Sequence, residues 1–389
     1  MISSNSTCIL RLFPVLCILA LFVGCSGSSD DDGFLLLAMA EQTVSVVYVD
    51  RSQTTNPCDG ENWDTAYVSL QDALINAPAG SEIWVAQGRY TLGDTREVSF
   101  TLKEGVGVYG GFIGDENFRD ERDCEANETI LSGDIGTLDD KSDNCYHVVT
   151  GADNAILDGF IITGGNADRD GVNSDRYGGG MSNNNSSPTV TNCTFSDNSA
   201  DYGGGMFNSN SSSPIVTNCT FSGNSADYGG GMRNTESSPT VTNCTFSDNS
   251  ATYFGGGMRN TESDPTVTNC TFSNNSASTG GGMGNDNSSD PTVTNCILWG
   301  NTATLGNQIY NSSSSPTITC SCIEGGGFAG EGVINVDPLL NDDLTLKSNS
   351  PCIDTGDDVA VPDGITEGLD GNPRISGDHV DMGAYEYQQ

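Results

Sequence analysis

The stretch GGGMRNTESSPTVTNCTFSDNSATYF at residues 229–254 decides the fold, because close copies of it follow one another along the chain. Its GGGM block recurs with the methionine at positions 181, 206, 232, 258 and 283, and Ile309 continues the series. The spacings are 25, 26, 26, 25 and 26 residues. A period this short and this even is too small for separate domains and predicts the coils of a solenoid.

Within each copy the pattern predicts three short strands. The first begins at GGGM with Met181 inward, the second has Val190 inward, and the third carries Cys193 and Phe195 on its inner face. Asn192 breaks the alternation between the second and third strands and suits a left-handed turn. Stacked in register, equivalent positions form ladders of valine, phenylalanine and asparagine. The prediction is an all-β, single-stranded parallel β-helix solenoid, with about a dozen coils at roughly 25 residues per coil.

Composition agrees with a thin, repetitive structure and excludes several functions. The 389 residues carry 14 Lys and Arg against 52 Asp and Glu, a formal net charge of −38. Binding to nucleic acid needs clustered cations, so this balance excludes a nucleic-acid partner. Only 35% of the residues are hydrophobic, which is too few for a thick globular core.

The N-terminus has the features of an export signal. Residues 12–24 form an apolar run after Arg11, too short to span a bilayer but suited to a signal peptide over residues 1–24. The sequence FVGC that ends at Cys25, followed by SGSSDDDG, resembles the lipobox of bacterial lipoproteins. The resemblance implies a lipid on Cys25, a tether over residues 25–42, and an exported protein anchored to a membrane at the cell surface, in the outer membrane. The alternative is ordinary cleavage after Ala40.

The two ends of the solenoid need covers, because open strand edges promote aggregation. Residues 69–77 have apolar side chains at helical spacing and predict a short capping helix at the N-terminal end. Residues 43–177 are predicted to form this cap and irregular coils, residues 178–334 the regular repeats, and residues 335–389 a domain that closes the C-terminal end.

One cysteine recurs in each regular coil, at positions 193, 219, 244, 270, 296 and 320. The pattern favours a stack of buried thiols that act as small apolar side chains, and metal or redox chemistry is the alternative. Parallel side chains in register point the same way, which is poor geometry for a disulfide. Cys322 and Cys352 lie in the closing region and are the better disulfide pair.

Several further motifs resemble known families. The GGGM blocks and the Phe-x-x-Asn pairs, such as Phe195 with Asn198, resemble the repeats of chlamydial polymorphic outer-membrane proteins. YGGFIGDE at 109–116 and ILDGFIITGGN at 156–166 are similar to right-handed parallel β-helix proteins of the pectin-lyase-like superfamily. VDMGAYEY at 380–387 looks like the choice-of-anchor domain of surface proteins. The resemblance implies a right-handed β-helix and, by fold analogy alone, a polysaccharide lyase or another carbohydrate-active enzyme.

An acidic loop has partial calcium-site spacing. Oxygen ligands at Asn166, Asp168 and Asp170, followed by Gly171 and Asp175, partly resemble loops in which alternate carboxylates wrap a calcium ion. The usual bidentate Glu at the twelfth position is missing. The alternative is an acidic surface loop between coils.

Aromatic residues precede several of the glycine blocks: Tyr177, Tyr202, Tyr228 and Phe254. On successive coils they are expected to form a ladder, which either stacks on sugar rings or packs over the glycine turn. Arg233 and Arg259 are the only cations over residues 178–320, and salt bridges to Glu236 and Glu262 three residues on are the expected structural role. No catalytic residue pattern is found. The leading hypothesis is a non-catalytic surface protein for adhesion, glycan binding or structural display, and the alternative is a polysaccharide lyase.

Overall fold

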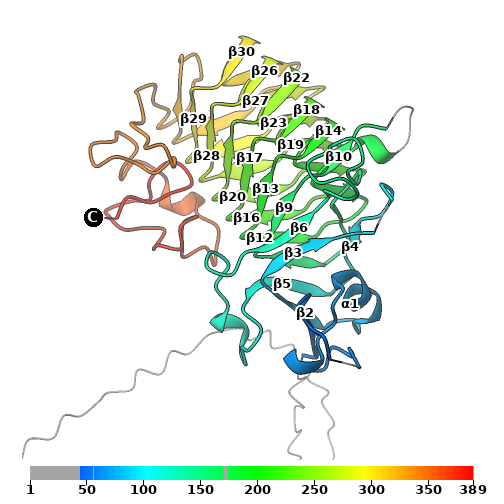
Figure 1. The fold of residues 1–389 in the computed structure, drawn as a ribbon. Helices are drawn as coiled ribbons and strands as arrows, with labels where there is room; N and C mark the ends of the chain where they lie inside the picture. Colours follow the sequence, from blue (N-terminus) through cyan, green and yellow to red (C-terminus); the bar gives the residue numbers. More distant parts are fainter. Residues whose placement is uncertain (1–43, 56, 94, 170–173, 389) are drawn as a thin grey trace, which may run out of the picture. The chain divides into compact units, whose positions relative to one another are not determined.

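The computed structural model describes residues 44–55, 57–93, 95–169 and 174–388. The chain from Val44 onward forms one compact unit, in which parallel strands of successive coils lie directly beside one another (Figure 1). Every pairing between named strands is parallel, with equivalent repeat residues opposite each other, such as Met206 opposite Met232. The predicted parallel β-helix is confirmed.

The strands form four sheets, called A to D, whose members are given with their bounds. Sheet A contains β1 (Val46–Val49), β2 (Glu82–Ala86), β5 (Gly107–Phe112), β8 (Ile156–Asp158), β12 (Thr189–Thr191), β16 (Ile215–Thr217), β20 (Thr240–Thr242), β24 (Thr266–Thr268), β28 (Thr292–Thr294) and β32 (Thr317–Thr319). Sheet B contains β3 (Gly88–Thr91), β6 (Thr129–Ser132), β9 (Ile161–Thr163), β13 (Thr194–Ser196), β17 (Thr220–Ser222), β21 (Thr245–Ser247), β25 (Thr271–Ser273), β29 (Ile297–Trp299) and β33 (Cys322–Ile323). Sheet C contains β4 (Phe100–Thr101), β7 (Val149–Thr150), β11 (Met181–Asn184), β15 (Met206–Ser209), β19 (Met232–Thr235), β23 (Met258–Thr261), β27 (Met283–Asp286) and β31 (Ile309–Ser312). Sheet D contains β10 (Asn166–Ala167), β14 (Ser199–Tyr202), β18 (Ser225–Tyr228), β22 (Ser250–Phe254), β26 (Ser276–Thr279) and β30 (Thr302–Leu305).

Each regular coil has four strands rather than the three predicted. The additional strand is the one in sheet D, where Ala200 pairs with Ala226 and turns its methyl group inward. A single small inward residue gives almost no apolar periodicity, so this strand is hard to recognise in the sequence.

The coils are fewer than the dozen predicted. Sheet A, the longest sheet, has ten strands. The difference arises in the N-terminal part, where long connections such as residues 113–128 and 133–148 use chain length without adding a coil. Short 3-10 helices occur in these and other connections: η1 (Trp63–Thr65), η2 (Arg119–Glu121), η3 (Ser174–Arg176) and η4 (Asp358–Ala360).

Ladders of identical side chains fill the interior of the regular coils. The methionines, valines, cysteines and phenylalanines predicted to point inward are buried, with Met232, Val241 and Phe246 fully inaccessible. The rings of Phe195, Phe221, Phe246 and Phe272 stack nearly parallel, with centroid separations of 4.8, 4.7 and 4.5 Å. The repeat therefore places a continuous apolar column along the helix.

Two buried asparagine ladders accompany the apolar column. In sheet C, side-chain amides hydrogen-bond from coil to coil at 2.8–2.9 Å through Asn183, Asn208, Asn234, Asn260, Asn285 and Asn311. Before sheet D, a second ladder at 2.8–3.1 Å joins Asn198, Asn224, Asn249, Asn275 and Asn301. The expected corner column begins at Asn192, where φ is 51°. Asn218 donates a side-chain hydrogen bond to Asn192, and Asn243 donates one to Asn218. The column is interrupted at Asn269, whose side-chain amide has no partner within the described chain.

The helix α1 (Leu70–Asn76) confirms the predicted capping element. The Ser69 hydroxyl accepts a hydrogen bond from the backbone N–H of Asp72, and Leu70, Ala73 and Leu74 are buried. The helix packs against β1, β2 and β4 at the N-terminal end. It therefore shields strands at the start of sheets A and C.

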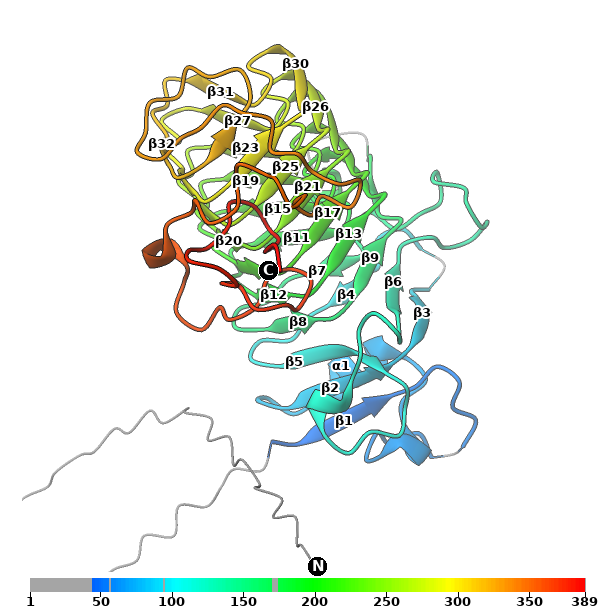
Figure 2. The same ribbon diagram turned by 90° about the vertical axis from the view of Figure 1, so that its left-hand side faces the viewer.

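The C-terminal region lies against the side of the coils as well as the end. Phe328 and Val333 pack against the main core near the last coil. Beyond them the chain returns along the corner between sheets A and B, where Asn295 exchanges hydrogen bonds of 3.0 and 2.7 Å with the backbone of Asp357 (Figures 1 and 2). The Asn243 amide donates to the Glu367 carbonyl at 2.8 Å. Most of the region thus covers a flank rather than the end it was expected to close.

Five of the six repeat cysteines form the expected buried stack, and the sixth, Cys320, is only half-buried and lies outside it. From Cys193 to Cys296 they are buried free thiols. Each donates to the carbonyl two residues before it, as Cys244 does to Thr242 at 3.1 Å. Cys322 and Cys352 lie in a separate buried cluster and hydrogen-bond to each other as thiols. Their predicted disulfide stays a prediction.

Candidate functional site

The outer face of sheet C carries the residues that depart most from the repeat. Strand pairing places Ser182, Phe207, Arg233, Arg259, Gly284 and Tyr310 in one outward column across β11, β15, β19, β23, β27 and β31. The inward neighbours of these positions are nearly constant: the preceding residue is Met in every coil but the last, where it is Ile309, and the following residue is always Asn. A second outward column, two residues further along each strand, varies as well and runs through Asn184, Ser209, Thr235, Thr261, Asp286 and Ser312. The chemistry of this face is therefore set by two positions per coil.

The aromatic residues before the glycine blocks lie beside this column and form part of the predicted ladder. Tyr177 stacks on Tyr202 at 5.0 Å between centroids, and Tyr202 stacks on Tyr228 at 5.5 Å. The fourth expected member, Phe254, lies opposite Tyr228 in the strand register, after an irregularity in β22, but its ring packs elsewhere. Tyr253 takes its place against Tyr228 at 5.1 Å, and Phe254 meets Tyr310 edge-on instead.

The two arginines predicted to lie beside this ladder cover its ring faces. The Arg233 guanidinium carbon lies 4.5 Å from the centroid of Tyr202, and that of Arg259 lies 4.6 Å from that of Tyr228. Such cation–π contacts, together with the ring stacking, use the faces that a sugar would need. Packing therefore accounts for most of the ladder, and Tyr253 is its most exposed ring, at 49%.

The expected salt bridges to Glu236 and Glu262 are wrong. Both glutamates have φ of 52° in the left-handed turn that follows the strand, and the salt bridge of Arg259 goes to Asp286 on the next coil at 2.6 Å. The sequence separation of 27 residues hid this pair, although it is close to one period of the repeat.

Arg233 differs from most arginines of the described chain. Of ten arginines there, eight form an ion pair with a carboxylate: Arg89, Arg96, Arg119, Arg122, Arg169, Arg176, Arg259 and Arg374. Arg233 and Arg51 have no such pair with a described residue. Nε of Arg233 donates to the Thr235 hydroxyl at 3.2 Å, and its buried Nη1 has no acceptor among the described residues. Burial, followed by repulsion from Arg259, lowers the pKa of Arg233 to about 10.

A groove of about 360 Å³ lies beside this guanidinium. Hydroxyl, amide and aromatic groups line it: Ser174, Tyr177, Ser182, Asn184, Phe207, Ser209, Arg233 and Thr235. None of these residues is acidic, in a chain with 52 Asp and Glu. Sequence reasoning missed Phe207 and the polar members, although all but Ser174 and Tyr177 occupy matching positions of consecutive repeats.

The residues predicted to bind calcium are partly described. Asp168 accepts hydrogen bonds from Asn166 at 2.9 Å and from Arg96 at 2.6 Å, and Asp175 pairs with Arg169 at 2.6 Å. Asp170 lies outside the described residues, as does the lipidation site predicted at Cys25. The described part of the chain contains no group of three or more His, Cys, Asp or Glu side chains able to hold a metal ion. Calcium binding stays a prediction.

A known protein family supports the fold. Residues 143–275 match the family model described as a right handed beta helix region. The chain is a right-handed parallel β-helix. Two solved structures resemble this β-helix: pectate lyase Pel9A, with 15% identity over 88% of this chain and 96% of that one and a TM-score of 0.41, and a mutant pectin methylesterase in complex with hexasaccharide IV, with 13% identity over 79% and 98% and a TM-score of 0.34. At these identities the likeness concerns the fold alone. No curated protein matches the chain.

Proposed function

We propose that this β-helix is an exported, non-catalytic protein that binds acidic glycans in the groove on the outer face of sheet C. The observation that carries the proposal is Arg233, a half-buried guanidinium without a carboxylate partner among the described residues, beside a groove whose described lining contains no acid. A sugar carboxylate supplies the missing acceptor, because guanidinium groups bind carboxylates through charge-assisted hydrogen bonds.

The rest of the groove suits the remainder of a uronate residue. Ser182, Asn184 and Ser209 present hydroxyl and amide groups to sugar hydroxyls, while Tyr177 and Phe207 provide an apolar wall. A few placed polar groups on a partly apolar surface are typical of small-ligand sites. Because the rest of the protein is strongly acidic, binding is expected to be weak and to depend on this local contact.

The test measures binding of oligogalacturonate, and of its fully methyl-esterified form, to residues 41–389 by titration calorimetry. The acid should bind and the ester should bind at least tenfold more weakly, because a hydrogen bond to a charged group contributes about 1.5–3 kcal/mol. Arg233→Gln should weaken binding of the acid by roughly tenfold or more for the same reason.

Arg259→Gln is the matched control, since it removes the same charge one coil away from the groove, where Asp286 already pairs with it. It should change the affinity by less than about threefold. Ser182→Phe is a second variant, which fills the groove with the side chain that Phe207 places on the next coil. Unchanged affinity in both Arg233→Gln and Ser182→Phe would reject the groove as the glycan site.

A polysaccharide lyase is the second function to test, and one observation favours it. The Arg233 guanidinium lines the groove, and its pKa, lowered to about 10 by burial, lets it give up a proton more readily than an ordinary arginine. A lyase produces unsaturated sugars that absorb in the ultraviolet. Rising absorbance on polygalacturonate that disappears in Arg233→Gln would replace the non-catalytic proposal by this one.

Surface anchoring is the other part of the proposal. It is supported by the lipobox-like sequence before Cys25 and by the apolar run of residues 12–24. Searching the described residues finds no helix long and apolar enough to cross a membrane. Membrane fractionation of cells expressing the full chain should find it with the membranes, and Cys25→Ser should release it. Cys58→Ser is the control, and equal membrane recovery of Cys25→Ser and the natural chain would contradict lipidation.

A further inference from the structure

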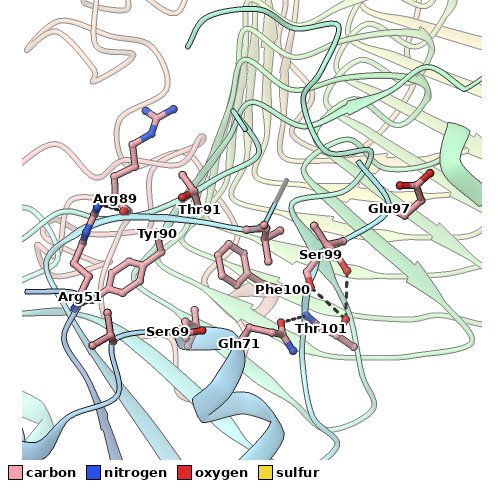
Figure 3. Close-up of a pocket in the computed structure, with 15 residues that line it drawn as sticks. Arg51, Ser69, Gln71, Arg89, Tyr90, Thr91, Glu97, Ser99, Phe100 and Thr101 are labelled. Atoms are coloured by element: carbon pink, nitrogen blue, oxygen red, sulfur yellow. Dashed lines mark hydrogen bonds between the residues drawn. The ribbon is translucent and has the colours of Figure 1, made fainter. Parts of the chain in front are cut away.

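A second pocket lies in the N-terminal coils, far along the sequence from the groove on sheet C. In regular coils a sheet D strand connects sheets B and C. The connection from β3 to β4 has no described strand of sheet D, and a hollow of about 570 Å³ lies beside it (Figure 3). This volume is in the range of small-molecule pockets, about 300–1,000 Å³.

The floor of this pocket is aromatic. Tyr90 and Phe100 reach it from β3 and β4 and are 4% and 2% exposed, and Leu70 from α1 joins them. The Tyr90 hydroxyl is already used, because it donates to the Ala86 carbonyl at 2.9 Å. The floor is therefore closed by core side chains, and the accessible apolar surface of the pocket comes from Val68, which is 44% exposed, and from half-buried Leu92. Such a lining suits an apolar body rather than a hydrogen-bonding group.

One wall carries a cation without a carboxylate. Figure 3 shows Arg51 and Arg89 on one side of Phe100 and Glu97 on the other. Arg89 pairs with Asp134 at 2.9 Å, and Glu97 lies 3.6 Å from Arg169. Arg51 donates to the Arg89 carbonyl and has no ion pair with a described residue. It is the second of the two arginines, beside Arg233, that lack one, and both line pockets.

Hydroxyl groups lie along the edge of the pocket. Thr91 is exposed at the end of β3, Ser99 directly precedes β4, and Thr101 ends β4. The backbone N–H of Thr101 donates to the side-chain oxygen of Gln71 in α1 at 3.3 Å. This last bond holds the helix against the pocket wall. An apolar lining, a guanidinium without an ion pair to a described residue, and few polar groups together define the chemistry of a ligand.

We infer that this pocket binds a small carboxylate with a flat apolar body, such as an aromatic carboxylic acid. The carboxylate pairs with Arg51, and the body lies against Val68 and Leu92, above the floor that Phe100 and Tyr90 close. The guanidinium binds a carboxylate more strongly than a neutral amide, because charge-assisted hydrogen bonds are the stronger ones. The site is separate from the groove at Arg233 and does not depend on glycan binding there.

The test uses 3-phenylpropionate and its neutral counterpart 3-phenylpropanamide as probes, with residues 41–389 followed by ligand-detected NMR. The acid should bind saturably at millimolar concentration. The affinity for the amide should be lower by a factor of roughly ten or more. Arg51→Gln should weaken binding of the acid by about tenfold and leave binding of the amide unchanged.

Two further variants keep the test independent of folding. Arg119→Gln removes the same charge from the N-terminal coils outside the pocket, where Arg119 pairs with Glu82, and should leave the affinity unchanged. Thr91→Trp fills the pocket from an exposed strand position and should abolish binding of both probes. The inference is overturned by absent binding at millimolar acid, by equal affinity for acid and amide, or by undiminished binding in Arg51→Gln. Arg233→Gln, measured alongside, separates failure of this site from failure of the sheet C groove.

Discussion

The regular coils over residues 178–319 use all four sheets, whereas the described N-terminal coils over residues 44–177 use sheets A, B and C and reach sheet D only at β10. The two regions also have different interiors and surfaces. The regular coils repeat one set of inward side chains and contain two of the ten arginines in the described chain. The N-terminal coils vary in length, have no long ladders, and contain seven of those arginines. Repetition gives cooperative stability, and departures from it create sites. The two arginines that have no ion pair with a described residue lie where the pattern is broken, one in a coil with no described sheet D strand and the other in a column that changes residue.

The largest expected difference between the two regions concerns their aromatic cores. Phe221→Ala should destabilise the protein by about 3–5 kcal/mol, because it leaves a cavity in a buried column. Phe221 also stacks on two rings at 4.8 and 4.7 Å, whereas buried Phe160 in the N-terminal coils has no such partner among the described residues. Phe160→Ala should therefore be about 1–2 kcal/mol milder. Equilibrium urea unfolding measures both, and equal losses would show that the ladder adds nothing beyond burial.

A disulfide in the C-terminal flank is expected to have the next largest effect. Cys322 and Cys352 already contact each other, whereas thiols of the regular column point the same way along the stack. Oxidation would close a loop of about 30 residues and stabilise the folded chain by about 3–4 kcal/mol. Alkylation with and without reductant, followed by mass spectrometry, identifies the bond. Cys352→Ser should abolish the difference in stability between oxidised and reduced protein, and Cys58→Ser should not. Two free thiols at these positions in exported protein would contradict the pairing.

Buried asparagines sharpen the comparison further. The Asn249 side chain donates to the Phe221 carbonyl at 2.9 Å, accepts from the Asn224 backbone N–H at 3.1 Å, and continues a ladder. Asn144 in the N-terminal coils donates to one carbonyl, that of Gly164, at 2.6 Å. Asn249→Ala leaves several buried groups unpaired and should destabilise by about 2–3 kcal/mol, against about 1 kcal/mol for Asn144→Ala. Asn184→Ala, on the exposed face, is the control and should stay within about 0.5 kcal/mol. Equal losses at positions 249 and 144 would show that the ladder is not cooperative.

The sequence predicts what repeats and misses what is unique. The inward positions of Met181, Val190 and Phe195 follow from spacing alone, because a stacked coil must bury the same position each time. The sheet D strand was missed because its only inward residue is Ala200. The interior asparagine ladders were missed because a buried amide is recognisable only when its neighbour on the next coil is known to satisfy it.

The same distinction holds for the candidate site. The proximity of Tyr202, Tyr228 and the arginines could be predicted from the common period. The partner of Arg259 could not be assigned by local spacing, because the turn conformation at Glu262 directs the chain away and Asp286 arrives from the next coil. The pocket at Arg51 forms where the connection from β3 to β4 has no described strand of sheet D. No residue pattern in the sequence predicts that a strand will be lacking there.

The smallest expected effect is a pH dependence in the C-terminal flank, which neither set of coils shares. Burial raises the pKa of Glu386 from 4.5 to about 7, against the opposing effects of the backbone N–H groups of Asp381 and Ser376 and, to a smaller extent, of Arg374, 3.9 Å away. The folded state therefore favours the protonated carboxyl: its contribution is full below about pH 4.5 and is lost as the pH rises toward 7. Burial also raises the pKa of neighbouring Asp381, so its contribution to stability falls with rising pH in the same way.

Hydrogen exchange of residues 374–387 should thus quicken from pH 5 to 7, after correction for the intrinsic rate. Glu386→Gln should flatten most of this trend, leaving the part due to Asp381, while exposed Glu331→Gln should not change it. A trend that persists unchanged in Glu386→Gln would assign the dependence to Asp381 instead, and would mean that the pairing with Arg374 keeps Glu386 ionised.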